Sequence, residues 1–326
     1  MLAMRIILYA ICYNSNIGYI GFHAQENTNR KSIRVWGAKL LLFTKERRLS
    51  EMNDVKMQDL CRTVRSDIVT MVHKAGSGHP GGSLSATELM VGLYFGDYFH
   101  VDPTNPEWDG RDRFILSKGH VAPVLYSVLA RKGFFPVEEL GTLRKLGSML
   151  QGHPHKQSTP GLDCSSGSLG QGLSIANGLA VGFKKQGKSN RVYCLLGDGE
   201  LQEGQCWEAV MTAAQHHLDN VCAIVDYNHV QLDGTLEEIK EMGDLAAKWH
   251  DFGWNVIELD GHDLSQVISA YEMAASYKGK PSVLIANTVK GKGVSFMEND
   301  CNWHGNAPSA DQLAQALAQI NGKAVE

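Results

Sequence analysis

Two apolar runs of the chain are each followed by side chains that carry oxygen donors. The run 192–196 leads into Gly-Asp-Gly-Glu, with a carboxylate at Asp198, and the run 221–225 leads into Asp-Tyr-Asn-His-Val, with an amide at Asn228. In an open parallel sheet, ligands bind beyond the carboxyl ends of the strands. Hard oxygen donors suit Mg²⁺ or Ca²⁺, and Mg²⁺ usually completes its octahedron with phosphate oxygens and water. The pattern therefore predicts a metal and diphosphate site, and the glycines on either side of Asp198 leave room for the anion.

These residues also have a simpler interpretation. An Asp-Gly pair and an Asn are both common in turns, and turn chemistry alone accounts for the Asp-Gly pair. The occurrence of both features at successive strand ends favours the ligand site.

Three histidines, His79, His120 and His153, each directly follow a glycine. A glycine allows a loop to bring the next side chain close to a ligand. Imidazole titrates near neutral pH and can move protons there. Taken singly, each of these residues is better explained as a structural or surface histidine.

The hydrophobic pattern predicts the elements that must position these side chains. Apolar residues recur at spacings of three and four from Leu60 to Ala75, which indicates an amphipathic helix shortly after Met52. The segment from Ser85 to Glu88 has the spacing of a capping box, and it would open a second helix.

Helices and strands alternate beyond residue 160. The sequence predicts helices at 172–185, 203–217, 264–277 and 311–320, and strands at 192–196, 221–225, 255–259 and 283–286. The run 192–196 is apolar throughout, as in a strand that is buried on both faces. This alternation indicates βαβ units and an α/β fold with a parallel sheet covered by helices.

Composition excludes several classes of protein. The 326 residues suggest about two domains or one large α/β unit. A net charge of −4 argues against a nucleic-acid binder that is driven by bulk charge. The seven cysteines contain no Cys-x-x-Cys pair, so neither a disulfide framework nor a zinc knuckle is indicated. No apolar run reaches the ~18 residues of a membrane span. We expect a cytoplasmic protein with reduced thiols.

The motifs resemble those of thiamine diphosphate enzymes, and of transketolase in particular. Six blocks occur in the order of that family, across about residues 55 to 308. They are Gly-Ser-Gly-His-Pro-Gly-Gly at 76–82, Ser-Lys-Gly-His at 117–120, Gln-Gly-His-Pro at 151–154, Gly-Ser-Leu-Gly-Gln-Gly at 167–172, Gly-Asp-Gly-Glu-Leu-Gln-Glu-Gly at 197–204 and Trp-Glu-Ala at 207–209. The resemblance implies a parallel-sheet thiamine diphosphate-binding domain with helices on both faces.

The resemblance also implies a cofactor site. Asp198 and Asn228 would ligate Mg²⁺, for which Ca²⁺ or Mn²⁺ could substitute, and the carbonyl of Val230 would be a third protein ligand. The residues expected to contact thiamine diphosphate are His120, Gly167, Leu169, Gly199, Asn228 and His304. The turn 290–293 lacks the spacing of a Walker A motif, and we expect it to form a loop near the diphosphate.

The same resemblance implies the catalytic residues. His79, His120 and His153 would surround the reacting carbon, hold sugar hydroxyls and move protons. Glu203 would be a buried carboxylate at a subunit interface that links paired active sites.

A complete transketolase is much longer than this chain. The pyrimidine-binding domain, with the glutamate that activates the cofactor, has no counterpart here. The resemblance thus implies the amino-terminal subunit of a split transketolase, which is active only with a separate carboxy-terminal subunit in a two-plus-two heterotetramer. Together they would move a two-carbon ketol unit from a ketose phosphate to an aldose phosphate.

Two alternatives remain open. His155, Cys164 and the Tyr-Asn-His around the metal ligand depart from the family pattern, which leaves room for an enzyme specialised for an unusual pentose phosphate. A non-catalytic Mg-diphosphate-binding homologue is harder to reconcile with the intact histidine set. Residues 1–51 show neither periodicity nor a targeting signal, and we expect a non-native or disordered leader before a binding domain at 52–326.

Overall fold

The structure is a computed structural model, and it describes residues 55–322. The leader expected at 1–51 lies outside this range. Within residues 55–322, no helix has the length and apolarity that crossing a membrane would require.

Five parallel strands form one sheet in the order β1-β2-β3-β5-β4. The strands are β1 (Arg113–Leu116), β2 (Val192–Gly197), β3 (Val221–Tyr227), β4 (Asn255–Asp260) and β5 (Ser282–Asn287). The four strands expected from the sequence are all present, and their ends shift by no more than two residues. The edge strand β1 was missed, because a four-residue run is too short to stand out from its surroundings.

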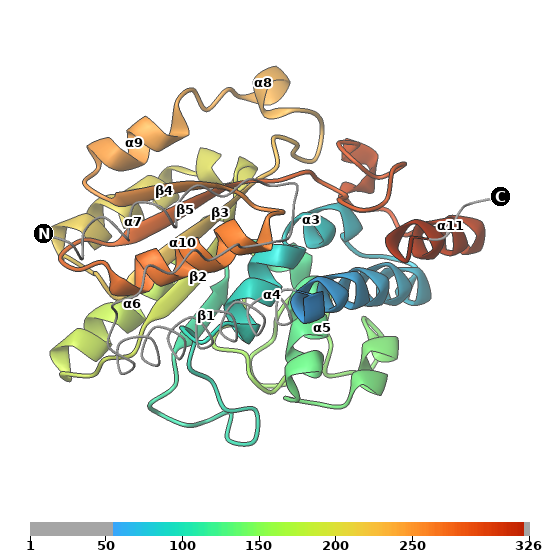
Figure 1. The fold of residues 1–326 in the computed structure, drawn as a ribbon, viewed down its shortest axis with the longest axis horizontal. Helices are drawn as coiled ribbons and strands as arrows, with labels where there is room; N and C mark the ends of the chain where they lie inside the picture. Colours follow the sequence, from blue (N-terminus) through green and yellow to red (C-terminus); the bar gives the residue numbers. More distant parts are fainter. Residues whose placement is uncertain (1–54, 323–326) are drawn as a thin grey trace, which may run out of the picture. The chain divides into compact units, whose positions relative to one another are not determined.

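Helices cover both faces of this sheet. The α-helices are a first helix over 55–75, α3 (Pro80–Ser85), α4 (Thr87–Phe95), α5 (Ala122–Lys132), α6 (Gly172–Lys185), α7 (Gly204–Gln215), α8 (Leu236–Ile239), α9 (Leu245–Asp251), α10 (Leu264–Ser276) and α11 (Ala310–Ile320). The short 3₁₀ turns η1 (Gly119–Val121), η2 (Val137–Thr142), η3 (Gly199–Gln202) and η4 (Cys301–His304) lie between them. In Figure 1, α10 crosses in front of the strands.

The core is divided into two apolar layers by the sheet. On β3, Cys222 and Ile224 pack into the layer that contains α4, α5, α10 and the 55–75 helix. Val221, Ala223 and Val225 pack into the opposite layer, with α6, α7 and α9. Successive side chains of a strand point to opposite faces, so an uninterrupted apolar strand satisfies both layers. The prediction of a parallel sheet with helices on both faces is confirmed.

The capping box expected at Ser85 is wrong. Ser85 is the last residue of α3, and its hydroxyl donates to the carboxylate of Asp226 at 2.5 Å. Helix α4 begins at Thr87 with Ala86 at the N-cap position, where no side chain caps it. Glu88 turns instead to Arg65, at 2.6 Å. Ser85 and Glu88 therefore contact distant partners, on β3 and on the 55–75 helix, instead of capping α4.

Candidate active site

The ends of β2 and β3 bring the predicted metal ligands together. Gly197 of β2 lies opposite Asp226 of β3, so the residues that follow each strand share one edge of the sheet. One carboxylate oxygen of Asp198 accepts a hydrogen bond from Gly199 N at 2.7 Å, and the other accepts one from His229 N at 2.6 Å. The carboxylate therefore faces the 228–230 loop directly.

The 228–230 loop is held in an uncommon conformation. His229 adopts a left-handed backbone with φ of 63°, which asparagine and histidine tolerate better than most residues. The amide of Asn228 donates to Asp226 at 3.3 Å, and its oxygen accepts from Val230 N at 3.2 Å. The loop is thus ordered by the strand end that it follows.

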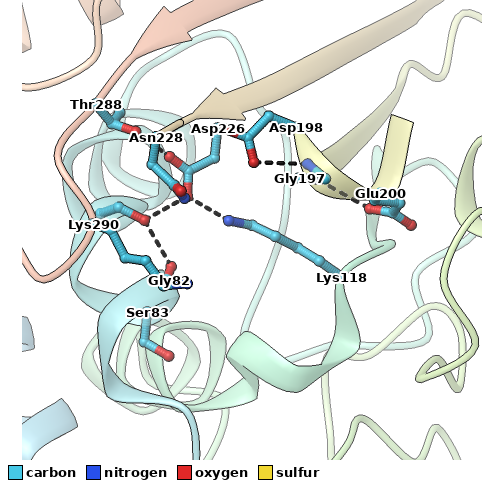
Figure 2. A network of polar contacts seen from close by, with 12 residues as sticks. Gly82, Ser83, Lys118, Gly197, Asp198, Glu200, Asp226, Asn228, Thr288 and Lys290 are labelled. Atoms are coloured by element: carbon cyan, nitrogen blue, oxygen red, sulfur yellow. Dashed lines mark hydrogen bonds and ion pairs between the residues drawn. The ribbon is translucent and has the colours of Figure 1, made fainter. Parts of the chain in front are cut away.

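Charge at this edge is arranged around two buried carboxylates (Figure 2). Asp226 is fully buried and accepts hydrogen bonds from Lys118 and Thr288. Burial alone would raise the pKa of Asp226, but the Lys118 ammonium holds it below its usual range. At Asp198, burial and the charge of Asp226 raise the pKa to about 6. Among the described residues, Asp198 forms no salt bridge, and the nearby charge of Lys118 does not offset its burial.

The donor set fits a divalent cation that also binds phosphate. Within residues 55–322, no group of three or more His, Cys, Asp and Glu side chains could hold a metal ion. The expected ligand set is not of that kind, because only one of its three members is such a side chain. It comprises the Asp198 carboxylate, the Asn228 amide and the Val230 carbonyl. Such a set leaves coordination positions for phosphate oxygens and water, as Mg²⁺ prefers. A cation bound there would also lower the pKa of Asp198, because it would stabilise the charged carboxylate.

A buried lysine lies beside these ligands. Lys290 follows β5, and its ammonium donates to the carbonyls of Val230 at 3.0 Å and Gln231 at 2.9 Å. It also lies 3.1 Å from Nδ1 of His304, and burial lowers its pKa to about 8. The 290–293 loop therefore lies next to residues that are expected at the metal and the diphosphate. The Val230 carbonyl has a second lone pair for a metal.

Glu200 joins three of the motif loops, and sequence reasoning assigned it no role. Its carboxylate accepts from the Ser117 hydroxyl at 2.5 Å, from Gly170 N at 2.8 Å and from Gly197 N at 3.0 Å. The side chain is buried, and burial raises its pKa. Its position just after a buried strand was the sequence feature that could have marked it as a residue of the site. Lys118 was likewise missed, although its motif had been recognised.

Four histidines from distant segments form one cluster. The ring centroid of His79 lies 5.2 Å from that of His120, 5.4 Å from that of His304 and 6.2 Å from that of His153. His79 precedes α3, His120 lies in η1, His304 ends η4, and His153 lies in the loop before the Gly-Ser-Leu-Gly motif. The structure thus brings together all four histidines that the sequence singled out.

Burial keeps these imidazoles neutral at physiological pH. Burial lowers the pKa of His79 to about 4 and that of His304 to about 3, with smaller contributions from nearby cations. It also lowers the pKa values of His120 and His153. A neutral imidazole offers one donor and one acceptor. Nδ1 of His79 is buried and has no hydrogen-bond partner among the described residues.

The Gly-Ser-Leu-Gly loop lies against this cluster. Gly167 has φ of 155°, and a Cβ built on it would be 3.3 Å from Cδ2 of His153. A Cβ on Gly119 would lie 2.8 Å from the backbone nitrogen of Gly167, so the two loops touch through their backbones. Leu169 is 38% exposed beside them.

Glu203 lies apart from the histidines. It is the N-cap residue of α7 and is exposed in the single chain. A Cβ on Gly170 would approach the Cβ of Glu203 to 3.0 Å, so the residue borders the Gly-Ser-Leu-Gly loop. Its burial in a subunit interface stays a prediction.

An α/β sheet with an acid and an amide at neighbouring strand ends, beside clustered neutral histidines, defines a diphosphate-binding enzyme domain. The sequence profile described as "Transketolase, thiamine diphosphate binding domain" matches residues 56–323. The 6-deoxy-6-sulfo-D-fructose transketolase subunit SqwG of Clostridium sp. is 42% identical over 266 residues, which cover 82% of this chain and 96% of that protein. An apulose-4-phosphate transketolase subunit from Phocaeicola vulgatus is 40% identical, over 79% of this chain and 91% of that protein.

Solved structures give the same result. A transketolase from Campylobacter jejuni is similar with a TM-score of 0.77 at 33% identity, over 81% of this chain and 42% of that chain. A transketolase variant from Pichia stipitis gives 0.78 at 30% identity, over 83% and 42%. The chain therefore spans less than half of these longer transketolases.

The chain belongs to the transketolase family of transferases and corresponds to its thiamine diphosphate-binding domain. Two relatives that it covers almost completely are themselves named as subunits, which confirms the prediction of a split amino-terminal subunit. The family prediction is confirmed as well.

Proposed function

We propose that this chain forms a Mg²⁺- and thiamine diphosphate-dependent transketolase together with a separate carboxy-terminal subunit. The enzyme would move a two-carbon ketol unit from a ketose phosphate to an aldose phosphate. One observation carries this proposal: the Asp198 carboxylate faces the 228–230 loop at 2.6 Å, at the edge of the sheet where Lys290 links that loop to His304 of the histidine cluster. A metal–diphosphate site and a proton-handling site thus adjoin each other.

The residues at the strand ends would hold the cofactor. Asp198, Asn228 and the Val230 carbonyl would bind Mg²⁺, and Gly199 and His304 would contact the diphosphate. Gly167, Leu169 and His120 would line the rest of the cofactor. Bound thiamine diphosphate supplies carbanion chemistry, and the protein supplies orientation and electrostatics.

The histidines would handle the sugar. Because burial keeps the imidazoles neutral, each can donate one hydrogen bond to a hydroxyl and accept another. The ring centroid of His79 lies 5.2 to 6.2 Å from those of the other three histidines, and His79 would contact a substrate hydroxyl. His120 and His153 flank it and would orient the remaining hydroxyls.

The metal assignment is tested by Asp198→Ala, with Asp233→Ala as the matched control. Asp233 is an exposed aspartate in the loop that follows the site. Calorimetry of the assembled enzyme with thiamine diphosphate and Mg²⁺ should show lost binding for Asp198→Ala and normal binding for the control. Removal of the only carboxylate among the ligands cannot be compensated by the Asn228 amide. Unchanged affinity in Asp198→Ala would refute the assignment.

The partner requirement is tested by ketol transfer with the purified chain, before and after addition of the second subunit. We expect turnover only in the presence of both. Closed two-fold symmetry is the commonest arrangement of oligomers, so a mass measurement should give two copies of each subunit. Substantial turnover by the lone chain would contradict the proposal.

A specialised substrate is the second candidate. The relatives named as subunits act, by their names, on 6-deoxy-6-sulfo-D-fructose and apulose 4-phosphate. The second candidate is therefore an enzyme specialised for an unusual ketose of that kind, such as an unusual pentose phosphate. Steady-state kinetics with a panel of donors decides the matter, because a specialised enzyme should have its highest kcat/KM for a donor outside the common ketose phosphates. We also place the enzyme in the cytoplasm, in keeping with the free cysteines of the described part.

A further inference from the structure

A buried cluster of charged and polar side chains lies on elements that carry none of the expected ligands. It consists of Arg65 on the 55–75 helix, Glu88 on α4 and His262 in the loop after β4. Glu88 pairs with Arg65 through both oxygens, at 2.6 and 2.7 Å, and also lies 3.0 Å from Nδ1 of His262. The side chains of Arg65 and Glu88 are 10% and 8% exposed. Desolvating such charges is costly unless all of them are well paired.

Two nitrogen atoms of this cluster form hydrogen bonds with the 289–292 loop. Nε of Arg65 donates to the carbonyl of Lys292 at 3.0 Å, and Nε2 of His262 accepts from Val289 N at 2.8 Å. Because Val289 N can only donate, Nε2 must be the unprotonated nitrogen, and Nδ1 carries the proton that is donated to Glu88. The two contacts lie on either side of Lys290.

Lys290 connects this loop to the active site. Its ammonium reaches the Val230 carbonyl and Nδ1 of His304, which are an expected metal ligand and an expected diphosphate contact. Asn299 N also donates to the Lys290 carbonyl, at 2.9 Å, so the backbone around the lysine is restrained. A shift of this loop would move the ammonium away from both partners.

We propose that Arg65, Glu88 and His262 are positioning residues that set the 289–292 loop and thereby hold the Lys290 ammonium against the diphosphate and metal site. The proposal rests on the function assigned to that site above. The cluster contacts neither the metal ligands nor the histidine cluster directly. It would act as the outer shell that orients a binding group.

The test uses the assembled enzyme and measures the dissociation constant of thiamine diphosphate at saturating Mg²⁺. His262→Phe keeps a ring but removes both polar contacts, and it should weaken cofactor binding about tenfold. His262→Gln retains an acceptor for Val289 N and should recover most of this loss. Asp67→Asn is the matched control. Asp67 lies on the same helix as Arg65 but pairs with Arg131 of α5, at 2.7 Å, and the substitution removes the charge from that pair. We expect normal cofactor affinity for this control.

A double-mutant cycle separates positioning from general destabilisation. If His262 acts through Lys290, then Lys290→Met combined with His262→Phe should bind the cofactor as well as Lys290→Met alone. Additive losses, or equal losses in His262→Phe and Asp67→Asn, would overturn the proposal. If His262→Phe does not assemble, Arg65→Lys replaces it in the same cycle, since it keeps the charge but loses the donor to Lys292.

The Asp198→Ala variant, measured in the same assay, separates the two levels of the argument. Normal cofactor affinity in that variant would overturn the proposed site itself. Lost affinity in Asp198→Ala together with control-like affinity in His262→Phe would overturn only the positioning role.

Discussion

The Glu200 carboxylate provides a quantitative test of how the motif loops are held together. It is buried and accepts hydrogen bonds from the Ser117 hydroxyl, from Gly170 N and from Gly197 N. Glu200→Ala removes the carboxylate that accepts hydrogen bonds from all three of these segments. The substitution should therefore lower the stability of the fold and loosen the loops around the cofactor.

The magnitude follows from the contacts. A buried donor that loses its acceptor costs about 1–3 kcal/mol, and Glu200→Ala leaves three donors without one. Burial raises the pKa of Glu200, so the hydrogen bonds do not fully offset the desolvation of its charge, and removal of that charge returns part of the loss. We expect a net decrease of about 3 kcal/mol in the free energy of unfolding. In a chain of 326 residues, that lowers Tm by about 4–5 °C.

The measurement is urea unfolding of the purified full chain, followed by circular dichroism. Glu203→Ala is the matched control, because Glu203 lies three residues away and is exposed in the single chain. The control should change the free energy of unfolding by no more than about 0.5 kcal/mol. If Glu200→Ala were no more destabilising than Glu203→Ala, the reasoning from buried hydrogen bonds would be refuted.

Three further outcomes can be measured by unfolding. Gly119→Ala inserts a Cβ 2.7 Å from a serine hydroxyl of the neighbouring loop, so it should destabilise the chain by about 1–3 kcal/mol; an unchanged midpoint would contradict this close approach. Gly178→Ala on α6 meets nothing within 4 Å and should instead stabilise the helix by up to about 1 kcal/mol, which a lower midpoint would disprove. At Glu88, burial raises the pKa, but Arg65 and His262 hold it below its usual value of 4.5. A lowered folded-state pKa stabilises the protein above pH 4.5, and this contribution disappears as the pH falls further. The stability gap between wild type and Glu88→Gln should therefore narrow below pH 4.5, and a constant gap would count against the pairing.

The strand-end motifs could be predicted because their signals are local. An uninterrupted apolar run followed by Gly-Asp-Gly indicates both a buried strand and the position where its ligands must lie. Asp198 and Asn228 were found in this way, and the structure brings them to one edge of the sheet. The sequence signals around the histidines were weaker. Only the resemblance of their motifs to a family predicted that these histidines share one site.

Local patterns failed where a distant partner competes for the same side chain. The Ser-x-x-Glu spacing at Ser85 matches a capping box, yet Ser85 donates to Asp226 on β3 and Glu88 pairs with Arg65. A buried carboxylate forms a stronger hydrogen bond with a charged partner than with a backbone N–H group. No spacing rule within a short window records such a competition.

The sequence by itself determined the strands β2 to β5, the motif loops and the residue types at the strand ends, because backbone periodicity and turn chemistry depend on near neighbours. Only the tertiary structure decided which charges are compensated. Lys118 neutralises Asp226, whereas Asp198 is left as a buried carboxylate with a raised pKa. It also decided that Arg65, Glu88 and His262, which lie up to 197 residues apart, grip the loop of Lys290. Burial and distance set these electrostatic relations, and both exist only after the chain has folded.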